Sequence, residues 1–424
     1  MAAVCCAGEW LVMSSSHYLL AVDIKENREP FVFDCTKAEQ KPEESDTDKC
    51  DGGGSQEKES DLILALALSP SGRYVALTDD NKRLILFRTQ PSWQCISTRW
   101  VVRRCTSLVF SRAEDELLVA DKSGDAYSFS VLEPQKPGEL KLGHLSMLQA
   151  IALSPDDKYI ITADRDEKIR VSLSKSSYNI QAFCLGHSEF VSTLCVPDGH
   201  PEWLLSGSGD GTVKLWHYES GRQLQSIDLQ QQGMSQGSDT DSDKPQRFAV
   251  SRIISSPDGR HVAVQCESFP SIQLFAVEEG SDRLLIPTET IELPQNPWDM
   301  TFDPQGRLWV LLQNKDTNVL QYTHRKKCWQ SESESPDLQK VSETLHTQWE
   351  LFKDSVGMVS RFKHLYKVNF DNMAPYLEKK KKRLQQQSKQ GGKKRAACQS
   401  NGAAKKSKVE NQSGDGAQKQ SSES

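Results

Sequence analysis

The sequence predicts an all-β fold built from repeats, and three observations support this prediction. Apolar strands separated by a Ser/Asp-Pro-x-Gly turn and by a polar, often acidic turn recur along the chain. The fullest copy runs from Gly186 and His187 to Trp216 and contains a Gly-Ser-Gly-Asp-Gly turn. Successive copies are 41, 44, 42, 60 and 47 residues apart, measured at Pro70, Ser111, Pro155, Pro197, Pro257 and Pro304. A period of about 40–45 residues and a copy that ends at Trp216 are typical of the WD repeat, which forms one four-stranded propeller blade.

An N-terminal copy completes the number of blades. Apolar segments at residues 9–12, 18–22 and 30–34 match the strands of the six anchored copies. Closing the blades into a ring protects the sheet edges, which limits the repeats to a small number. We therefore predict a seven-bladed WD-type β-propeller over residues 1–330, with six or eight blades as the alternatives. A mobile acidic loop is expected at about 36–61, and a polar insertion at about 230–245 explains the 60-residue spacing.

After the last blade the pattern changes from strand to helix. Leu338, Val341, Leu345, Trp349 and Phe352 recur at helical spacing. We expect this helix to pack on the propeller, followed by one more strand at residues 365–370 that returns to a terminal blade. Residues 331–375 are thus predicted to form a helix and a return strand.

Residues 376–424 differ in charge from the rest of the chain. They contain 13 Lys and Arg against 4 Asp and Glu, whereas the preceding residues contain 39 against 54, a net charge of −15. We predict a basic helix at the start of this segment and a disordered low-complexity tail after it. Such a tail either contacts an anionic partner or serves as an address, and a solubilising role is the alternative.

The tail contains two sets of candidate residues. Basic residues of the predicted helix are candidates for RNA phosphate contacts: Lys379, Lys380, Lys381, Lys382 and Arg383. Two further clusters, separated by ten residues, fit a bipartite nuclear-import signal: Lys393, Lys394, Lys405, Lys406 and Lys408. We therefore expect the protein in the nucleus, with the cytoplasm as a second location.

The features that resemble catalytic motifs have structural explanations. The glycine-rich stretch at residues 207–211 lies between two strands, whereas a dinucleotide or methyl-donor loop lies between a strand and a helix. His187, Ser206, Asp210 and Trp216 suggest a nucleophile set, but in WD repeats these residue types form a buried hydrogen-bonded tetrad. The acidic loop lacks the spacing of a calcium loop. We therefore predict no catalytic residue, cofactor or metal site in this chain.

Cysteine usage and hydropathy place further limits on the class of protein. The 11 cysteines include no Cys-x-x-Cys pair, so we expect reduced thiols. The chain shows neither a secretory signal pattern nor an apolar run of 18 residues.

Three successive blades carry charged turns between their second and third strands, at residues 79–83, 121–125 and 164–170. In the fourth blade the expected tetrad is His144, Thr162 and Asp166, with Ser172 at the tryptophan position. The other charged side chains of these turns are candidates for binding a partner: Lys122, Asp164, Arg165, Glu167, Lys168 and Arg170. Their mixed signs favour a protein partner over nucleic acid. A solvated rim with weak internal salt bridges is the alternative.

Several segments together resemble one family, the WD-repeat non-catalytic subunit of the tRNA (guanine-N7)-methyltransferase. The similarity is strongest in the middle blades and is carried by residues 77–80, 82–88, 119–125, 143–148, 163–172, 365–367 and 370–372. In that family a separate catalytic subunit uses S-adenosylmethionine to methylate N7 of a guanine in the tRNA variable loop. The resemblance implies that this chain binds and stabilises that subunit as a heterodimer, on the side that includes residues 164–170 and Lys122, and helps present tRNA. It implies no membrane partner.

Two other functions remain open from the residues alone. WD propellers also serve as substrate receptors of ubiquitin ligases, but the nearest motif here, Trp216-His217, lacks the aspartate that such receptors often carry. A nuclear assembly scaffold is the other alternative.

Overall fold

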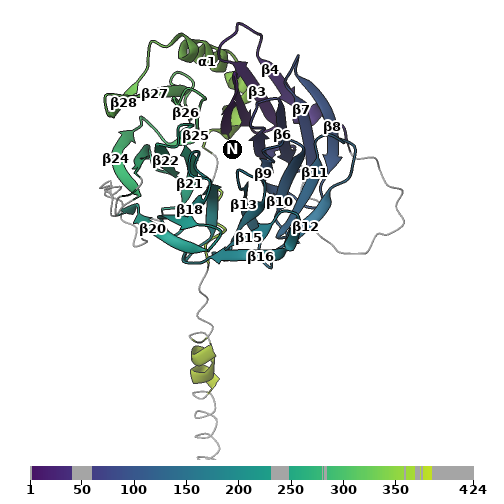
Figure 1. The fold of residues 1–424 in the computed structure, drawn as a ribbon, viewed down its shortest axis with the longest axis vertical. Coiled ribbons are helices and arrows are strands. Elements are labelled where there is room, and N and C mark those ends of the chain that lie inside the picture. Colours follow the sequence, from purple (N-terminus) through teal and green to yellow (C-terminus); the bar gives the residue numbers. More distant parts are fainter. Residues whose placement is uncertain are drawn as a thin grey trace, which may run out of the picture. The chain divides into compact units, whose positions relative to one another are not determined.

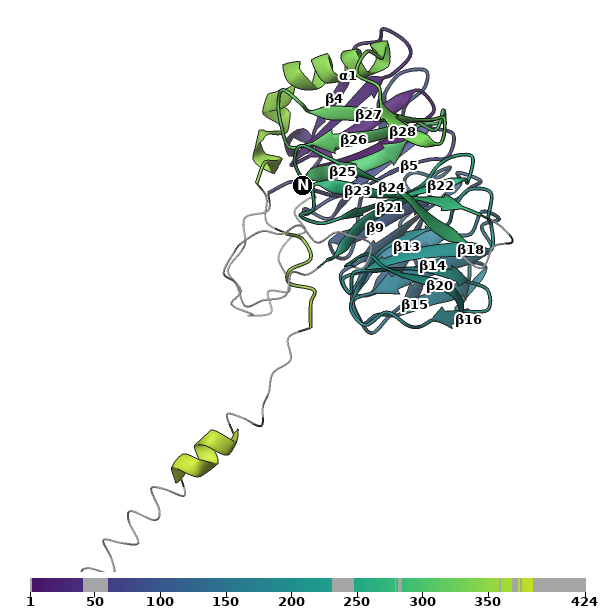
Figure 2. The ribbon, with the colours of Figure 1, turned by 90° about the vertical axis from the view of Figure 1, so that its left-hand side faces the viewer.

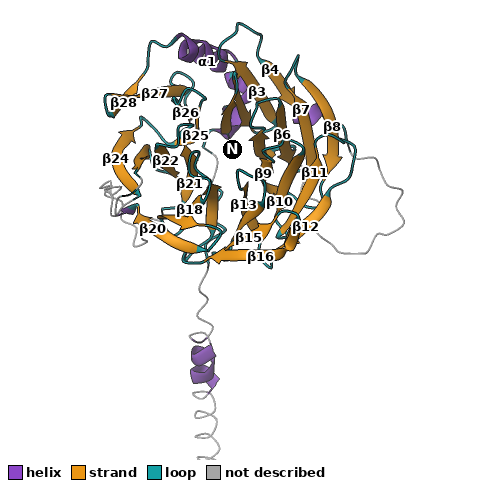
Figure 3. Cartoon of the chain, viewed as in Figure 1, coloured by secondary structure: helices purple, strands orange, loops and turns teal. Residues whose placement is uncertain are grey.

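The computed structural model describes residues 2–40, 60–230, 248–278, 280, 284–357, 360–367, 373 and 376–383. These residues form seven four-stranded antiparallel sheets arranged as the blades of a ring (Figures 1 and 3). The predicted seven-bladed β-propeller is therefore confirmed. In every blade the four strands are consecutive in the chain and pair in order.

The first three blades contain the N-terminal third of the chain. Their strands are, for blade 1, β1 (Ala3–Ala7), β2 (Trp10–Ser15), β3 (Tyr18–Asp23) and β4 (Phe31–Asp34); for blade 2, β5 (Ile63–Leu68), β6 (Tyr74–Asp79), β7 (Arg83–Arg88) and β8 (Gln94–Trp100); for blade 3, β9 (Cys105–Phe110), β10 (Glu116–Asp121), β11 (Asp125–Ser130) and β12 (Glu139–Gly143).

The remaining four blades complete the ring. Their strands are, for blade 4, β13 (Leu148–Leu153), β14 (Tyr159–Asp164), β15 (Ile169–Leu173) and β16 (Ser176–Cys184); for blade 5, β17 (Val191–Cys195), β18 (Trp203–Ser208), β19 (Thr212–His217) and β20 (Arg222–Asp228); for blade 6, β21 (Val250–Ser255), β22 (His261–Cys266), β23 (Ser271–Val277) and β24 (Leu285–Glu292); for blade 7, β25 (Pro297–Phe302), β26 (Leu308–Leu312), β27 (Val319–Arg325) and β28 (Cys328–Ser331).

The recurring Ser-Pro and Asp-Pro turns have a direct physical function. Ser69, Ser111, Ser154 and Ser256 each accept a hydrogen bond from the backbone N–H five residues later, at 2.9–3.0 Å. Asp303 accepts the N–H of Arg307 at 2.9 Å in the same way. These side chains satisfy a backbone donor where the chain reverses between the first and second strands, so the motif marks each blade in the sequence.

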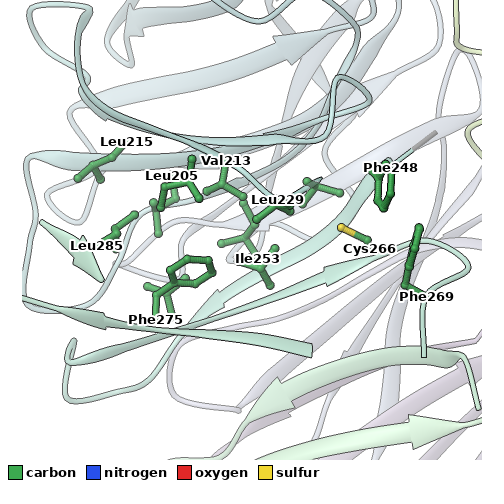
Figure 4. Packing of buried hydrophobic residues seen from close by; sticks show 14 of the residues in the cluster. Leu205, Val213, Leu215, Leu229, Phe248, Ile253, Cys266, Phe269, Phe275 and Leu285 are labelled. Carbon is green, nitrogen blue, oxygen red and sulfur yellow. The ribbon is translucent and has the colours of Figure 1, made fainter. Parts of the chain in front are cut away.

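Neighbouring blades pack through apolar side chains. Between blades 5 and 6, for example, Leu205, Val213, Ile253 and Phe275 belong to one buried cluster (Figure 4). Each fully buried side chain of this size stabilises the fold by roughly 1.5–3 kcal/mol. This packing makes the ring a rigid platform for the turns at its two faces.

The ring closes between blades 1 and 7 with the help of the predicted helix. α1 (Pro336–Thr347) and the short 3-10 helices η3 (Trp349–Leu351) and η4 (Lys353–Ser355) follow the last blade. Leu338, Val341, Leu345 and Phe352 are buried in a cluster that also contains side chains of β2 and β26. Figure 2 shows α1 beside β27 and β4. The helix is thus confirmed, and it holds the two ends of the ring together.

The predicted return strand is not found among the described residues. Leu365 lies in a turn and Tyr366 in a bend, and Lys367 has no regular structure, while residues 368–370 fall outside the described part. Blade 7 is already completed by β28, so it offers no vacant strand position. The apolar side chains instead pack with Phe362 against Phe190.

Other predicted segments lie largely outside the described residues. Of the acidic loop, Cys35–Lys37 forms the 3-10 helix η1 and Asp61 pairs with Arg83 at 2.5 Å, while residues 41–59 are not described. Residues 231–247 of the polar insertion and residues 384–424 of the tail are likewise outside. Residues 376–383 belong to a separate unit of the chain and are helical, with an ion pair of 2.9 Å between Lys382 and Glu378.

Candidate partner-binding surface

A buried aspartate ends the second strand of blades 2, 3 and 4. Asp79, Asp121 and Asp164 each accept the backbone N–H of the residue four positions later, at 3.0–3.1 Å. At most 2% of their surface is exposed. Each carboxylate thereby closes its own turn. The three charged turns therefore share one local design.

The structure corrects the predicted tetrad of blade 4. His144 donates from Nδ1 to Asp164 Oδ2 (3.0 Å), and its Nε2 is hydrogen-bonded to Thr162 Oγ1 (2.8 Å). Asp164, predicted to face a partner, is thus the tetrad acid, whereas Asp166, predicted to be that acid, is exposed. The reason is position: Asp164 is the last buried residue of β14, and Asp166 lies beyond it in the turn.

Blade 5 contains the full set of tetrad contacts. His187 bonds Asp210 through Nδ1 (3.0 Å) and Ser206 through Nε2 (2.7 Å), and Trp216 Nε1 donates to Ser206 Oγ (2.8 Å). Burial alone would raise the pKa of Asp210, but the hydrogen bond and charge of His187 lower it below its ordinary range. Ser206 has no exposed surface, so its hydroxyl cannot meet a substrate.

The two arginines of the charged turn in blade 4 are bonded within the chain. Arg170 donates from Nε to Ser172 Oγ (2.9 Å), from Nη1 to Gly143 O (3.0 Å) and from Nη2 to Ser177 O (2.9 Å). The Arg170 guanidinium thus contacts Ser172, the small residue at the position where blade 5 has Trp216. Arg165 donates from Nε to Leu365 O at 3.1 Å. Arg165 and Arg170 therefore have structural roles within the chain, which the sequence did not reveal.

The remaining candidates face solvent or lie at the surface. Lys122 and Lys168 are exposed, as is Asp166. Glu167 is half-buried and has a φ of 72°. Lys168 Nζ donates to the backbone oxygen of Asp166 at 3.4 Å. The exposed part of the predicted site is therefore smaller than expected. It consists of residues 166–168 on blade 4 and of Lys122, which follows the equivalent aspartate of blade 3.

Sequence reasoning missed the exposed apolar side chains of the same blade. On the outer strand β16, Tyr178, Ile180 and Phe183 are 80%, 45% and 41% exposed. Leu145 and Leu185, in the loops before and after blade 4, are 109% and 61% exposed. Large exposed apolar groups gathered on one element indicate a contact surface. Apolar and polar residues alternate at 178–181, as in any half-buried strand, so the sequence gives no signal that sets this strand apart.

The described residues contain no group of three or more His, Cys, Asp and Glu that could hold a metal ion. The cysteines that the structure describes are all free. Burial raises the pKa of Cys105, Cys184 and Cys266 to about 12, so these thiols stay protonated. No helix of the described part is long and apolar enough to span a membrane.

The predicted RNA-contact residues Lys379, Lys380, Lys381, Lys382 and Arg383 all lie on the exposed helix at 376–383. The predicted import residues, from Lys393 to Lys408, fall outside the described residues.

Comparisons with known proteins agree on one family. The model described as the tRNA methyltransferase TRM82 WD40 domain matches residues 24–141 and 133–339. The chain is 66% identical over 382 residues to the tRNA (guanine-N(7)-)-methyltransferase non-catalytic subunit wdr4 of Danio rerio, covering 89% of this chain and 91% of that protein. It is 44% identical over 374 residues to the corresponding WDR4 subunit of Homo sapiens, covering 88% of each.

Solved structures show the fold alone. The chain matches the structure of U3-55K with a TM-score of 0.57 and 20% identity, covering 78% of this chain and 92% of that one. It matches the RRP9 WD40 repeats with a TM-score of 0.58 and 20% identity, covering 74% and 87%. Taken with the family model and the close relatives, the chain belongs to the family of tRNA (guanine-N(7)-)-methyltransferase non-catalytic subunits with a WD-repeat propeller.

Proposed function

We propose that this chain binds and stabilises the catalytic subunit of a tRNA (guanine-N7)-methyltransferase and helps present tRNA to it. The catalytic subunit would hold S-adenosylmethionine and carry out the transfer. The observation that carries the proposal is the surface of blade 4, where exposed charges of the β14–β15 turn and exposed apolar side chains of β16 belong to the same blade of a chain in this family.

The two kinds of side chain would act differently in a complex. Burial of Tyr178, Phe183 and Leu185 by a partner would remove apolar surface from water and supply most of the affinity. The charges of Lys168 and Asp166 would fix the register and exclude other partners, because a mismatched charge pair is costly at an interface. The surface therefore fits a protein partner with an apolar centre and complementary charges.

The rigidity of the turn at residues 164–170 supports the proposal that this chain stabilises its catalytic partner. Asp164 and Arg170 fix residues 164–170 through five hydrogen bonds to the backbone and side chains around them. A surface already held in its binding conformation loses less entropy on association. The propeller would thereby order the elements of the partner that contact it, including those near the partner's active site.

The basic helix at 376–383 would add phosphate contacts that do not depend on sequence. Its five cations, Lys379 to Arg383, are all exposed. The clusters at Lys393, Lys394, Lys405, Lys406 and Lys408 would direct nuclear import. A nuclear location follows from this proposal and would be lost when both clusters are replaced by glutamine.

The direct test is guanine-N7 methylation of tRNA transcripts by the purified catalytic subunit, with and without this chain. We expect activity to depend strongly on this chain and to be absent from this chain alone. If the chain neither bound the catalytic subunit nor changed its activity, the proposal would be wrong.

A further inference from the structure

A cavity of about 180 Å³ lies in the central channel of the ring. Its wall includes residues from the first strands of five blades, β1, β5, β9, β21 and β25, together with Gln265 of β22 and Arg361, which follows η4. A second cavity, of about 270 Å³, has Ser251, Gln265 and Arg361 in common with the first. The two cavities therefore adjoin each other at these residues. We name Arg252 of β21, Gln265 and Arg361 the channel site.

Gln265 brings a free hydrogen-bond acceptor to this place. Its side chain is buried, with 3% of its surface exposed, and its Nε2 donates to Pro297 O at 3.2 Å. Because a carbonyl can only accept, this contact fixes the orientation of the amide. The amide oxygen Oε1 is buried and has no hydrogen-bond partner among the described residues. A buried acceptor of this kind is costly unless a donor satisfies it, and the adjoining cavities give room for one.

Two arginines supply donors to the same cavities. Arg252 Nε lies 3.3 Å from Asp299 Oδ1, and Arg361 Nη2 donates to Ser251 O at 3.0 Å. Burial lowers the pKa of Arg361, and the charge of Arg252 lowers it further, whereas Asp299 raises it. The two guanidinium groups are therefore neighbours around one carboxylate. A guanidinium carries five N–H donors, so both arginines keep donors beyond these contacts.

The carboxylates beside the arginines are engaged with other donors. Asp299 Oδ2 accepts the backbone N–H of Val4 at 2.9 Å. Glu267 accepts the backbone N–H of Arg361 at 3.1 Å through Oε1 and the hydroxyl of Ser360 through Oε2. These contacts hold the acids and the arginines in place. An anion at the channel site would thus be bound by the remaining guanidinium N–H groups rather than by a large excess of positive charge.

Inorganic phosphate matches the free groups of the channel site. Guanidinium groups form charge-assisted, often bidentate, hydrogen bonds with phosphate oxygens. The amide oxygen of Gln265 requires a donor, and inorganic phosphate keeps a P–OH group at neutral pH. Sulfate has a similar tetrahedral shape but carries no proton at this pH, and a phosphodiester has no P–OH group either. The free acceptor therefore favours inorganic phosphate over sulfate and over the backbone of a nucleic acid.

We propose that the channel site binds inorganic phosphate, with Arg252 and Arg361 donating to its oxygens and Gln265 Oε1 accepting its P–OH. The bound phosphate would connect blade 6 with the segment that follows η4, whose Phe362 packs against Phe190. It would stabilise the protein, because a ligand that binds only the folded state shifts the unfolding equilibrium. The inference goes beyond the proposed function and does not depend on the catalytic partner, since all the residues belong to this chain.

The test measures the binding of inorganic phosphate, sulfate and dimethyl phosphate to the purified full chain by isothermal titration calorimetry at pH 7. Constant ionic strength keeps the screening of charges equal for the three anions. We expect phosphate to bind at least about tenfold more tightly than the other two, because only phosphate satisfies the acceptor of Gln265. We also expect phosphate to raise the melting temperature more than sulfate does at the same concentration.

Three variants locate the bound phosphate. Arg361→Gln should weaken phosphate binding by about tenfold, because charge-assisted hydrogen bonds are lost. The matched control Arg260→Gln removes an exposed arginine from the β21–β22 turn of the same blade and should leave the affinity unchanged. Gln265→Met replaces the amide with an apolar group of similar length and should abolish the preference for phosphate over sulfate. The melting temperature of each variant shows whether it is folded.

Equal affinities of the wild-type chain for phosphate and sulfate would overturn the inference. Equal phosphate affinities of Arg361→Gln and Arg260→Gln would do so too, because the phosphate would then be bound elsewhere, such as on the basic residues of the tail. Dimethyl phosphate binding as tightly as phosphate would indicate a phosphodiester site and would also contradict it. If Gln265→Met failed to fold, the two arginine variants and the comparison with sulfate would still decide. A chain that bound phosphate but did not support methylation would contradict the proposed function alone.

Discussion

At the scale of single residues, two aspartates two positions apart have opposite roles. Asp164 is buried and bonded to His144 and to the N–H of Lys168, whereas Asp166 is exposed. The sequence could not distinguish them, because spacing to the WD position favours Asp166 and only the register of β14 with β15 places Asp164 inside. The residue types of the site were thus predicted, but their inward or outward direction was not.

This difference predicts unequal effects on stability. Asp164→Ala should reduce the free energy of unfolding by roughly 1–3 kcal/mol, because it leaves the donors of His144 and Lys168 unsatisfied in a buried place. Asp166→Ala should change it by less than about 0.5 kcal/mol, as expected for a surface residue. Urea unfolding of the two variants checks this, and equal losses would contradict the assignment of the tetrad acid.

A second prediction concerns pH. Burial, followed by the charge of His324, lowers the pKa of His261, with Asp258 acting in the opposite direction and Arg260 in the same one. The unfolded chain therefore binds this proton more readily than the folded protein. Stability contributed by neutral His261 is present above its ordinary pKa of 6.5 and is lost as the pH falls below that value towards the lowered one.

We expect the free energy of unfolding to fall between pH 7 and pH 5.5, and to fall less in His261→Gln. Denaturant unfolding at the two pH values provides the measurement. An identical pH dependence in wild type and variant would show that another group is responsible.

At the scale of elements, strands were predicted where a local contact fixes them. Five blades can be located in the sequence because one Ser or Asp side chain closes the turn between their first and second strands. β1 was missed because its sequence, Ala-Val-Cys-Cys-Ala, is short and built from small residues. The return strand was predicted from alternation alone, and alternation does not show whether a sheet has a vacant edge. Here β28 occupies that position, and Leu365 and Tyr366 pack with Phe362 against Phe190 instead.

The helix after the last blade makes a prediction about ring closure. Leu345 is fully buried among side chains of blades 1 and 7. Leu345→Ala should therefore lower the free energy of unfolding by about 2–5 kcal/mol. The exposed neighbour His346→Ala is the matched control and should have little effect. Thermal unfolding of both variants measures this, and equal stability would mean that α1 does not hold the ring closed.

At the scale of the whole molecule, the propeller separates structural from binding charges. Most charged residues of the turns stabilise the blades, and only a few, such as Lys168 on blade 4, remain available at the surface. The family follows from the sequence because the middle blades carry its motifs over a long stretch. The exposure of the apolar side chains on β16 could not be predicted from the sequence, since it depends on which strand of the blade faces solvent.

The measurement that tests the central claim most directly is the affinity of this chain for the catalytic subunit after charge reversal. Lys168 is preferred to Arg170, because Arg170 is bonded within the blade and its replacement would disturb the fold. We predict that Lys168→Glu weakens binding roughly tenfold, about 1.4 kcal/mol, with an unchanged melting temperature, while Lys326→Glu on blade 7 leaves the affinity at the wild-type value. Equal affinities for the two variants would contradict the proposal that blade 4 holds the catalytic partner.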